Sequence, residues 1–267
     1  MSLRTLAMPC IAIALAGCLN TGEPGPGQLN YGFVFLETNQ YATGEYVLRP
    51  NAIFYRTGGI RLPSTAGTGD LCADPEPYVV PPAGSFPPVI DAGESLLLTL
   101  SGIETPLEPV LVPGQPRRYV IASGDAVEFQ PGDTATVEIP GASPGFPSWT
   151  IEAKTAEAFE LEPVPIPEEP TQLQLNWSPP ASGPNSRMTV SLIYFTELGE
   201  HEQVYCELND DGEYRIDSQI AEGWRIAEAE GREAIFTRWR ITGLAVSGSV
   251  LLVMSTFQAP TPQTEAP

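Results

Sequence analysis

The sequence predicts an all-β fold arranged as two tandem β-sandwich domains. Of its 267 residues, 25 are Gly and 29 are Pro, which together is about twice the average usage. The longest stretch without either residue runs from Ser148 to Glu162, so long helices have no room to form. Apolar residues make up 42% of the chain. Short runs of alternating polar and apolar residues recur between turn signals, which is the pattern of a sandwich.

The charge balance excludes one large class of partners. The chain carries 33 acidic and 13 basic residues, for a formal net charge of −20. Nucleic acids bind proteins mainly through phosphate neutralisation by Lys and Arg. We therefore expect no nucleic acid partner.

Residues 1–17 have the features of a secretory signal peptide. Arg4 precedes an apolar run from Leu6 to Ala16, which Pro9 interrupts. The run is shorter than the roughly 20 apolar residues that a membrane-spanning helix needs. We therefore expect export from the cytoplasm without a transmembrane helix.

The tetrapeptide Leu15-Ala16-Gly17-Cys18 follows this apolar run and resembles the lipobox of bacterial lipoproteins. The resemblance implies that signal peptidase recognises Leu15, Ala16 and Gly17. It also implies that Cys18 becomes the first mature residue and carries diacylglycerol and an acyl chain such as palmitate, with no other cofactor. Residues 18–30 are expected to form a flexible tether. Leu19, in place of the Asp that retains inner-membrane lipoproteins, favours the outer membrane, facing either the periplasm or the cell surface. An ordinary signal peptide that happens to contain Cys18 is the alternative.

The first sandwich is predicted over residues 31–161. Its expected strands are Tyr31–Leu36, Glu45–Arg56, Tyr78–Val80, Ser95–Leu100, Val110–Val112, Arg118–Ala122, Ala126–Gln130, Thr134–Ile139 and two more between Trp149 and Leu161. A short helix between Trp149 and Leu161 is the local alternative, because Ala and Glu are frequent there.

A linker and a second sandwich follow. Residues 162–170 contain four prolines, which predicts a stiff linker and a domain boundary. The second sandwich is predicted over residues 171–258 and a disordered tail over 259–267. Its expected strands are Leu173–Trp177, Met188–Phe195, Gln203–Leu208, Glu213–Ile216, Trp224–Ala227, Ala234–Ile241 and Ser249–Phe257, with one helical turn from Asp217 to Glu222 that ends at Gly223.

Two resemblances bear on the fold. The run Leu173-Gln174-Leu175-Asn176-Trp177-Ser178-Pro179-Pro180 resembles one strand of fibronectin type III domains, whose Trp packs between two sheets, and it implies Ig-like or fibronectin III-like sandwiches. The order of Asp91-Ala92-Gly93, the segment 132–137, Asn176-Trp177-Ser178 and Cys206 is similar to uncharacterised secreted or lipid-anchored proteins of Gram-negative bacteria. That similarity carries no established activity.

Candidate catalytic and metal-binding residues are few. His201 is the single His and lies between Glu200 and Glu202, which favours an exposed hairpin over a general base. Asp210 and Asp211 are weak calcium candidates, because their spacing fits no EF-hand loop. Asp211-Gly212 instead predicts a hairpin turn between the flanking strands. A pair of catalytic carboxylates cannot be assigned from spacing, since the fold places such acids.

Four arginines form the remaining charged group. Arg225, Arg232, Arg238 and Arg240 lie close in sequence, with Arg238 and Arg240 on one strand face and Trp239 on the other. They could hold an anionic ligand. Because Glu228, Glu230 and Glu233 are interleaved, cross-strand pairing on a polar sheet face is the favoured interpretation.

Two cysteines remain once Cys10 leaves with the signal and Cys18 is lipidated. In an oxidising compartment Cys72 and Cys206 could form a disulfide, if their Cα atoms lie within about 7 Å. The alternative is a loop thiol at Cys72 and a buried thiol at Cys206, since they fall in different predicted domains.

The sequence therefore predicts a lipid-anchored envelope protein that acts as a binding or structural module and not as an enzyme. Its partners would be the bilayer and a protein or glycan ligand. A lipid-anchored carbohydrate-active hydrolase and a calcium-dependent adhesin are the alternatives. A carboxyl group with a raised pKa in a cleft would favour the hydrolase.

Overall fold

The computed structural model describes ten segments of the chain: 29–40, 44–57, 69–77, 89–111, 117–121, 127–183, 185–196, 199–228, 231–246 and 248–259. The predicted signal peptide, lipobox, most of the predicted tether and most of the predicted tail lie outside these residues. The predicted strand Tyr78–Val80 also lies outside them.

The described residues form sixteen strands and one short helix. In chain order these are β1 (Leu29–Gln40), β2 (Tyr46–Thr57), β3 (Leu71–Cys72), β4 (Glu76–Pro77), β5 (Leu96–Leu100), β6 (Ile103–Val110), β7 (Arg118–Ile121), β8 (Val127–Glu128), β9 (Thr134–Ile139), β10 (Trp149–Lys154), β11 (Leu173–Asn176), β12 (Arg187–Phe195), β13 (His201–Asn209), β14 (Glu213–Ile216), α1 (Glu222–Ile226), β15 (Glu233–Val246) and β16 (Ser249–Gln258).

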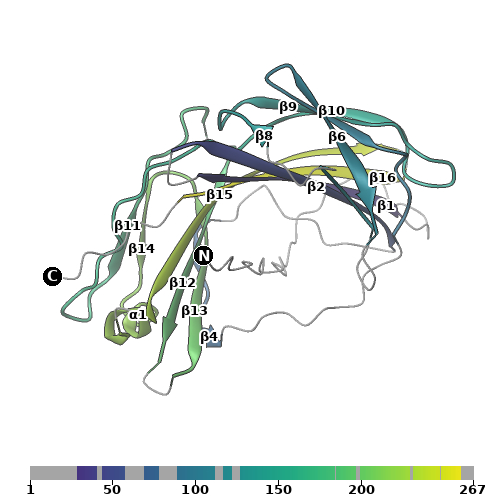
Figure 1. Cartoon of the computed structure of the whole chain (residues 1–267). Coiled ribbons are helices and arrows are strands. Elements are labelled where there is room, and N and C mark those ends of the chain that lie inside the picture. The colour runs from purple at the N-terminus through teal and green to yellow at the C-terminus, as the bar shows by residue number, and fades with distance from the viewer. Residues whose placement is uncertain are drawn as a thin grey trace, which may run out of the picture.

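One large mixed sheet contains fourteen of these strands (Figure 1). Its order is β10-β9-β5-β6-β7-β2-β1-β16-β15-β12-β13-β3, with β8 beside β2 and β4 beside β13. The other two strands, β11 and β14, form a separate antiparallel sheet. The predicted all-β class is thus confirmed.

The large sheet runs through both halves of the chain. β1 pairs in parallel with β16, with Asn30 opposite Ser249 and Asn39 opposite Gln258. β15 pairs with β12 at its start and with β16 along the rest of its length. The structure therefore does not show two tandem sandwiches, because strands from the two predicted domains share one sheet. Alternation and turn signals fix strand faces and ends, but they do not specify which strands pair.

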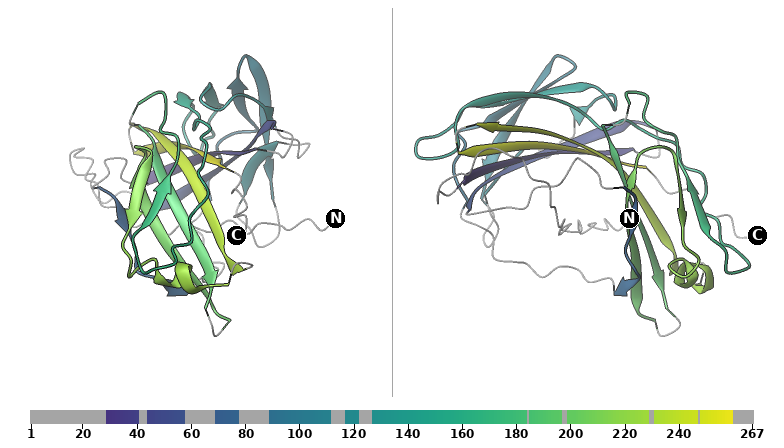
Figure 2. Two further views of the ribbon diagram at one scale, coloured as in Figure 1. Left: turned by 90° about the vertical axis from the view of Figure 1, so that its left-hand side faces the viewer. Right: turned by 180° about the vertical axis from the view of Figure 1, so that it is seen from behind.

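The large sheet curls over itself in the first half of the chain, and the small sheet covers it in the second half. In the first half, β9, β10 and β6 lie over β1, β2 and β16 (Figures 1 and 2). Val34 and Leu36 of β1 enter the core between these layers together with Leu98 of β5 and Val137 of β9. In β1, β5 and β9 these core residues alternate with more exposed ones, as a strand with one buried face requires.

In the second half, the β11–β14 sheet and α1 cover β12, β13 and β15 (Figure 1). Leu173, Leu175 and Trp177 point into this second core, as the alternation in the sequence predicts, and the Trp177 ring lies 6.4 Å from that of Phe236. Val164, inside the predicted linker 162–170, is also buried in this core. Segments on both sides of that linker therefore stabilise the second half.

The helix α1 corrects a local prediction. The sequence predicted a helical turn that ends at Gly223 and a strand over Trp224–Ala227, but the helix begins at Glu222 and includes Trp224. Trp224 is buried in the second core, and a short apolar run does not distinguish a strand from a helix. Gly223 lets the helix approach β12, since a Cβ there would lie 2.2 Å from Tyr194 Oη. Among the described residues, no helix is long and apolar enough to cross a bilayer.

The turn at Asp211-Gly212 forms, but the predicted hairpin does not. Gly212 has a φ of +106°, as a Gly-dependent turn requires. β14 then pairs with β11 and not with β13. The chain therefore crosses from one layer to the other at this turn, and Asp210 faces inward between the layers, where it is 8% exposed.

Candidate functional site

A depression opens beside β15 at the point where β12 begins. β12 pairs with β15 only up to Arg187, which lies opposite Trp239. Beyond Trp239, β16 is the one described strand that pairs with β15. β10 packs against β15 in this region. The depression is lined by residues from three strands and the loop before β12, including Lys154, Asn185, Arg187, Trp239, Arg240 and Thr242.

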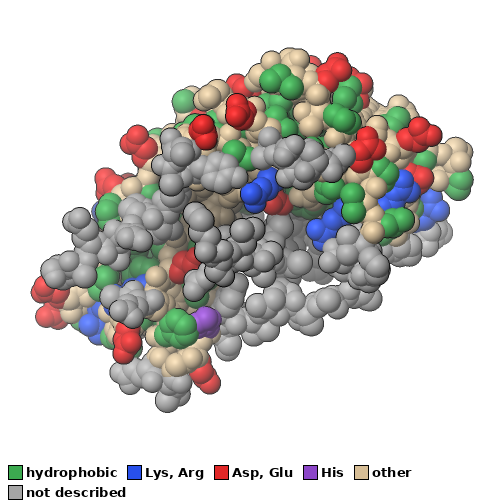
Figure 3. All heavy atoms as spheres, in the orientation of Figure 1, with side chains coloured by type: hydrophobic (Ala, Val, Ile, Leu, Met, Phe, Trp, Pro, Cys, Tyr) green, Lys and Arg blue, Asp and Glu red, His purple; other side chains and the backbone are tan. Residues whose placement is uncertain are grey.

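Three of these lining residues are cationic. Lys154 is the last residue of β10, Arg187 the first of β12, and Arg240 lies in the middle of β15. Arg187 donates to neutral acceptors, Asn209 Oδ1 at 2.6 Å and the Gly69 carbonyl at 3.1 Å. The depression thus collects positive charge in a strongly acidic chain. On the face shown in Figure 3, acidic side chains are more widespread than basic ones.

Arg240 is buried without an ion pair. It is 7% exposed, and the part of the chain that the structure describes places no carboxylate within ion-pairing distance of it. Nη2 donates to Ser182 Oγ at 2.6 Å, while Nε is buried with no hydrogen-bond partner. No hydrogen bond is described for the third nitrogen, Nη1, and Arg240 is one of the residues that line the depression.

Glu157 and Arg240 both contact Ser182. The Glu157 carboxylate accepts the backbone N–H groups of Ala181 and Ser182 at 2.7 and 3.2 Å. Burial opposes ionisation of Glu157, but the hydrogen bonds from Ser182 and Ala181 and the charge of Arg240 together lower its pKa below the ordinary value. Glu157 is therefore charged at neutral pH and offsets part of the positive charge.

Arg238 lies on the same face of β15 as Arg240 but, unlike Arg240, has a carboxylate partner. It forms a fully buried ion pair with Asp210, with Nε 2.6 Å from Oδ2 and Nη2 2.8 Å from Oδ1. Its remaining donors reach the carbonyls of Ala158 and Ser178 at 3.1 and 2.6 Å. Trp177 Nε1 and Ser186 Oγ donate to the same carboxylate at 2.9 and 2.5 Å.

This network surrounds Asp210, one of the two weak calcium candidates. Both carboxylate oxygens of Asp210 already accept hydrogen bonds from Arg238, Trp177 and Ser186, so Asp210 has no free ligand position. Asp211 is exposed. The structure, over its described residues, has no group of three or more His, Cys, Asp or Glu side chains that could hold a metal.

The four arginines do not share one polar sheet face, so that interpretation is wrong. Arg225 pairs with Glu222 within α1 at 2.6 Å. Arg232 donates to the carbonyls of Trp224, Arg225 and Ala227 at the end of α1. Arg238 and Arg240 do share a face of β15, as predicted, but this face is buried and not polar. None of the interleaved acids pairs with these four residues among the described contacts.

A second depression lies in the first half and is lined by Asp91, Gly93 and Arg117 among others. Asp91 accepts the Gly93 N–H and the Tyr119 hydroxyl, both at 3.0 Å, and pairs with Arg117 at 3.2 Å. The Gly93 hydrogen bond is the main reason that the pKa of Asp91 is lowered, and Tyr119 and Arg117 add to it. Burial is the main reason that the pKa of Tyr119 is raised. Asp91 is thus a satisfied carboxylate that orders its loop.

His201 lies at the start of β13, after the loop that follows β12, and is exposed, as predicted. Its ring packs edge-on against Phe195, with the centroids 3.9 Å apart. Sequence analysis did not identify Lys154 as a site residue, because Lys154 lies in the predicted first domain and the other residues that line the depression lie in the second.

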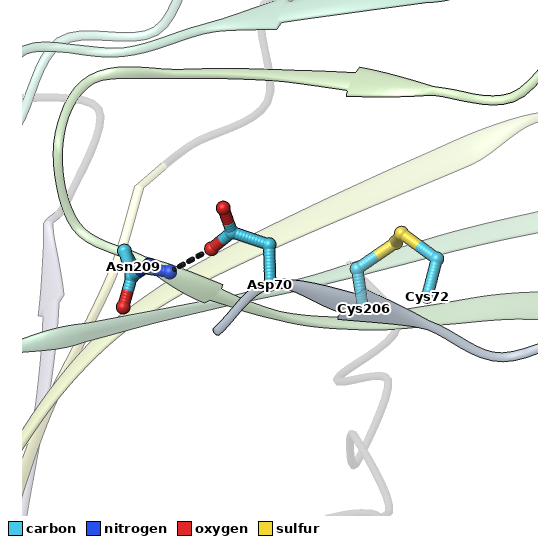
Figure 4. Close-up of a disulfide and its surroundings, with 4 residues drawn as sticks. All are labelled: Asp70, Cys72, Cys206 and Asn209. Carbon is cyan, nitrogen blue, oxygen red and sulfur yellow. Dashed lines mark hydrogen bonds between the residues drawn. A yellow bond between two sulfur atoms is a disulfide. The ribbon is translucent and has the colours of Figure 1, made fainter. Parts of the chain in front are cut away.

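Cys72 and Cys206 form a disulfide, with Cα atoms 4.0 Å apart (Figure 4). They are opposite residues of the antiparallel pair β3–β13. Asp70, just before β3, accepts the Asn209 N–H at 2.5 Å beside this bridge. The sequence did not decide between this disulfide and two free thiols, because Cys72 and Cys206 fall in different predicted domains. The segment 69–77 instead lies along the edge of β13.

Glu37 is the one described carboxyl group with a raised pKa. Burial on β1 raises it, and the hydrogen bond from Asn51 Nδ2 at 3.2 Å and the charges of Arg118 and Arg49 only partly offset this effect. Glu37 lines neither depression. Glu37 is therefore not a carboxyl group with a raised pKa inside a cleft, which is the feature that would favour a hydrolase.

Replacing Glu37 with Gln is expected to raise the melting temperature at pH 7. A raised folded-state pKa means that the charged form costs stability in the folded state, so stability is highest at acidic pH and falls as pH rises through that pKa. The Gln oxygen can keep the Asn51 hydrogen bond. The gain should vanish below the ordinary Glu pKa, and the exposed control Glu138→Gln should show no such pH dependence. An equal rise in melting temperature at all pH values would show that the buried charge of Glu37 is not its cause.

Comparison with known proteins gives no further guide to the site. No family model, no curated protein and no solved structure matches this chain significantly.

Proposed function

We propose that this chain is a lipid-anchored lipoprotein of the bacterial envelope that acts as a binding or structural module without catalytic activity. It is held at the outer membrane by acyl chains on Cys18, and its folded part engages a protein or glycan ligand. Each buried methylene contributes about 0.8 kcal/mol, so two or three acyl chains anchor a protein stably where one does not.

The observation that carries the proposal is the tetrapeptide Leu15-Ala16-Gly17-Cys18 at the end of a short apolar run. Small residues before the Cys suit signal peptidase, and the thiol is the atom that is alkylated. The disulfide Cys72–Cys206 supports the same placement, because disulfides persist in the oxidising envelope and are rare in the cytoplasm.

The described side chains support binding more than catalysis. Asp210 is occupied by Arg238, Trp177 and Ser186, which weakens the adhesin alternative. Glu37 lies away from both depressions, which weakens the hydrolase alternative. The depression at Arg240 has cationic side chains without acid–base partners, an arrangement suited to holding a ligand rather than transforming it.

Metabolic labelling with a palmitate analogue tests the anchor. We expect the natural chain to be labelled and to fractionate with membranes. We expect Cys18→Ser to lose the label and to enter the soluble fraction. Cys10→Ser is the matched control, because it removes a thiol from the predicted signal peptide and should leave labelling unchanged. Equal labelling of Cys18→Ser and the natural chain would refute the proposal.

A further inference from the structure

We propose that the depression at the start of β12 binds an oxyanion, the phosphate, sulfate or carboxylate group of a ligand. Arg240 provides the buried contact, and Lys154 and Arg187 complete the positive surroundings. The proposal rests on the proposed function in treating the chain as a binding module, but it does not depend on the lipid anchor.

The first argument is the missing partner of Arg240. Buried charges in folded proteins are almost always paired, and Arg238, two residues earlier on the same face, has Asp210 as its bidentate partner. Arg240 is buried to a similar degree and has one neutral hydroxyl acceptor. A bound oxyanion at Nη1 would supply the charge that Asp210 supplies to Arg238.

The second argument is that another residue lining the depression has a buried hydrogen-bond donor without a partner. The indole Nε1 of Trp239 is buried and has no hydrogen-bond partner among the described residues. Unpaired buried donors are rare in native structures and each requires an explanation. Trp239 and Arg240 point to opposite sides of β15, and both reach the depression because β12 stops opposite Trp239. Two residues that line the depression thus each carry a buried donor without a described partner.

The third argument is local charge. Lys154, Arg187 and Arg240 all line the depression. The charge of Arg240 acts on Glu157, Asp70 lies beside the Arg187 contacts, and Asp210 is already neutralised by Arg238. The chain as a whole repels anions, with its net charge of −20. At physiological ionic strength, however, interactions beyond about 8 Å are screened, so the nearby cations outweigh the distant acids. An anion would thus be attracted at this depression in spite of the net charge of the chain.

Thermal melting of the purified full-length chain in non-ionic detergent tests the site. The probes are sodium phosphate, sodium sulfate and sodium galacturonate, each compared with sodium chloride at equal ionic strength, with galactose as the neutral control. A ligand that binds only the folded state raises the melting temperature with its concentration. We expect at least one oxyanion to raise it above the chloride value, and galactose to leave it unchanged.

Variants separate a binding role from a structural one. Arg240→Met removes an unpaired buried charge, so it should melt no lower than the natural chain in chloride and should lose the oxyanion shift. Lys154→Gln, at an exposed position, should keep the melting temperature and weaken affinity by up to about fivefold. Arg215→Gln, which makes the same change of charge outside the depression, should keep the full shift.

The outcomes are distinct. A shift with phosphate or sulfate alone assigns the site to phosphoryl or sulfuryl groups, and a shift with galacturonate alone assigns it to carboxylates of acidic sugars. No shift beyond chloride, or a full shift in Arg240→Met, would overturn the oxyanion site. Since neither result depends on palmitate labelling, failure of the site and failure of the lipid anchor are told apart.

Discussion

Replacing Arg238 with Met is expected to lower the free energy of unfolding by about 3–5 kcal/mol, because removing one partner of a buried ion pair leaves the other charge uncompensated. Asp210, with a side chain only 1% exposed, would keep its charge without its cationic partner. The carbonyls of Ala158 and Ser178 would lose their donor as well. The loss should appear as a lower urea midpoint.

The same strand offers a matched control for this prediction. Arg240→Met removes the same side chain from the same face of β15, but it leaves no buried carboxylate unpaired. It should therefore cost little or even stabilise the chain. The double variant Arg238→Met/Asp210→Leu should recover part of the loss, because a buried ion pair replaced by apolar residues is often neutral. Equal losses in Arg238→Met and Arg240→Met would show that the ion pair is not what stabilises this region.

Strand positions and faces were predictable from the sequence because they depend on local pattern. Thr134–Ile139 was predicted with both ends correct, and Leu173, Leu175 and Trp177 were predicted to point inward together. A period of two residues places alternate side chains on opposite faces whatever the partner strand is. The same reasoning placed Arg238 and Arg240 on one face.

Strand partners were not predictable, because pairing is decided by contacts far apart in sequence. β1 and β16 are separated by most of the chain, yet they lie side by side in parallel. Trp224 was assigned to a strand because a short apolar run fits either structure, and the close approach of Gly223 to Tyr194 is visible only in three dimensions.

The candidate site depends on such distant contacts even more strongly. The sequence places Arg238 and Arg240 on one strand face, but nothing local distinguishes the arginine that pairs with Asp210 from the one that does not. Lys154 joins Arg240 because β10 folds back against β15. The one available signal was that Lys154 is the single Lys of the chain, and that signal has no physical link to a site.

Removing the disulfide with Cys72→Ala/Cys206→Ala is expected to lower the free energy of unfolding by about 2–5 kcal/mol. The two cysteines are 134 residues apart, and a cross-link that closes a long loop restricts the unfolded chain strongly. Ala is the suitable replacement because Cys206 is fully buried in the second core, where a Ser hydroxyl would need a partner.

The disulfide also holds a short edge strand. β3 has only two residues, and beyond their pairing with β13 the Ala73 N–H donates to the Tyr205 carbonyl at 2.9 Å. The segment 69–77 also meets β12 and β13 through Arg187–Gly69, Asp70–Asn209 and the β4 pairing, but a short edge pairing of this kind is only marginally stable without a further link. Without the bridge, amides of residues 69–77 should exchange with solvent faster than those of β12, which pairs on both sides. Urea melts with and without dithiothreitol supply the control, since the reduced natural chain should match the double Ala variant. An unchanged midpoint on reduction would mean that the sheet pairing alone positions this edge.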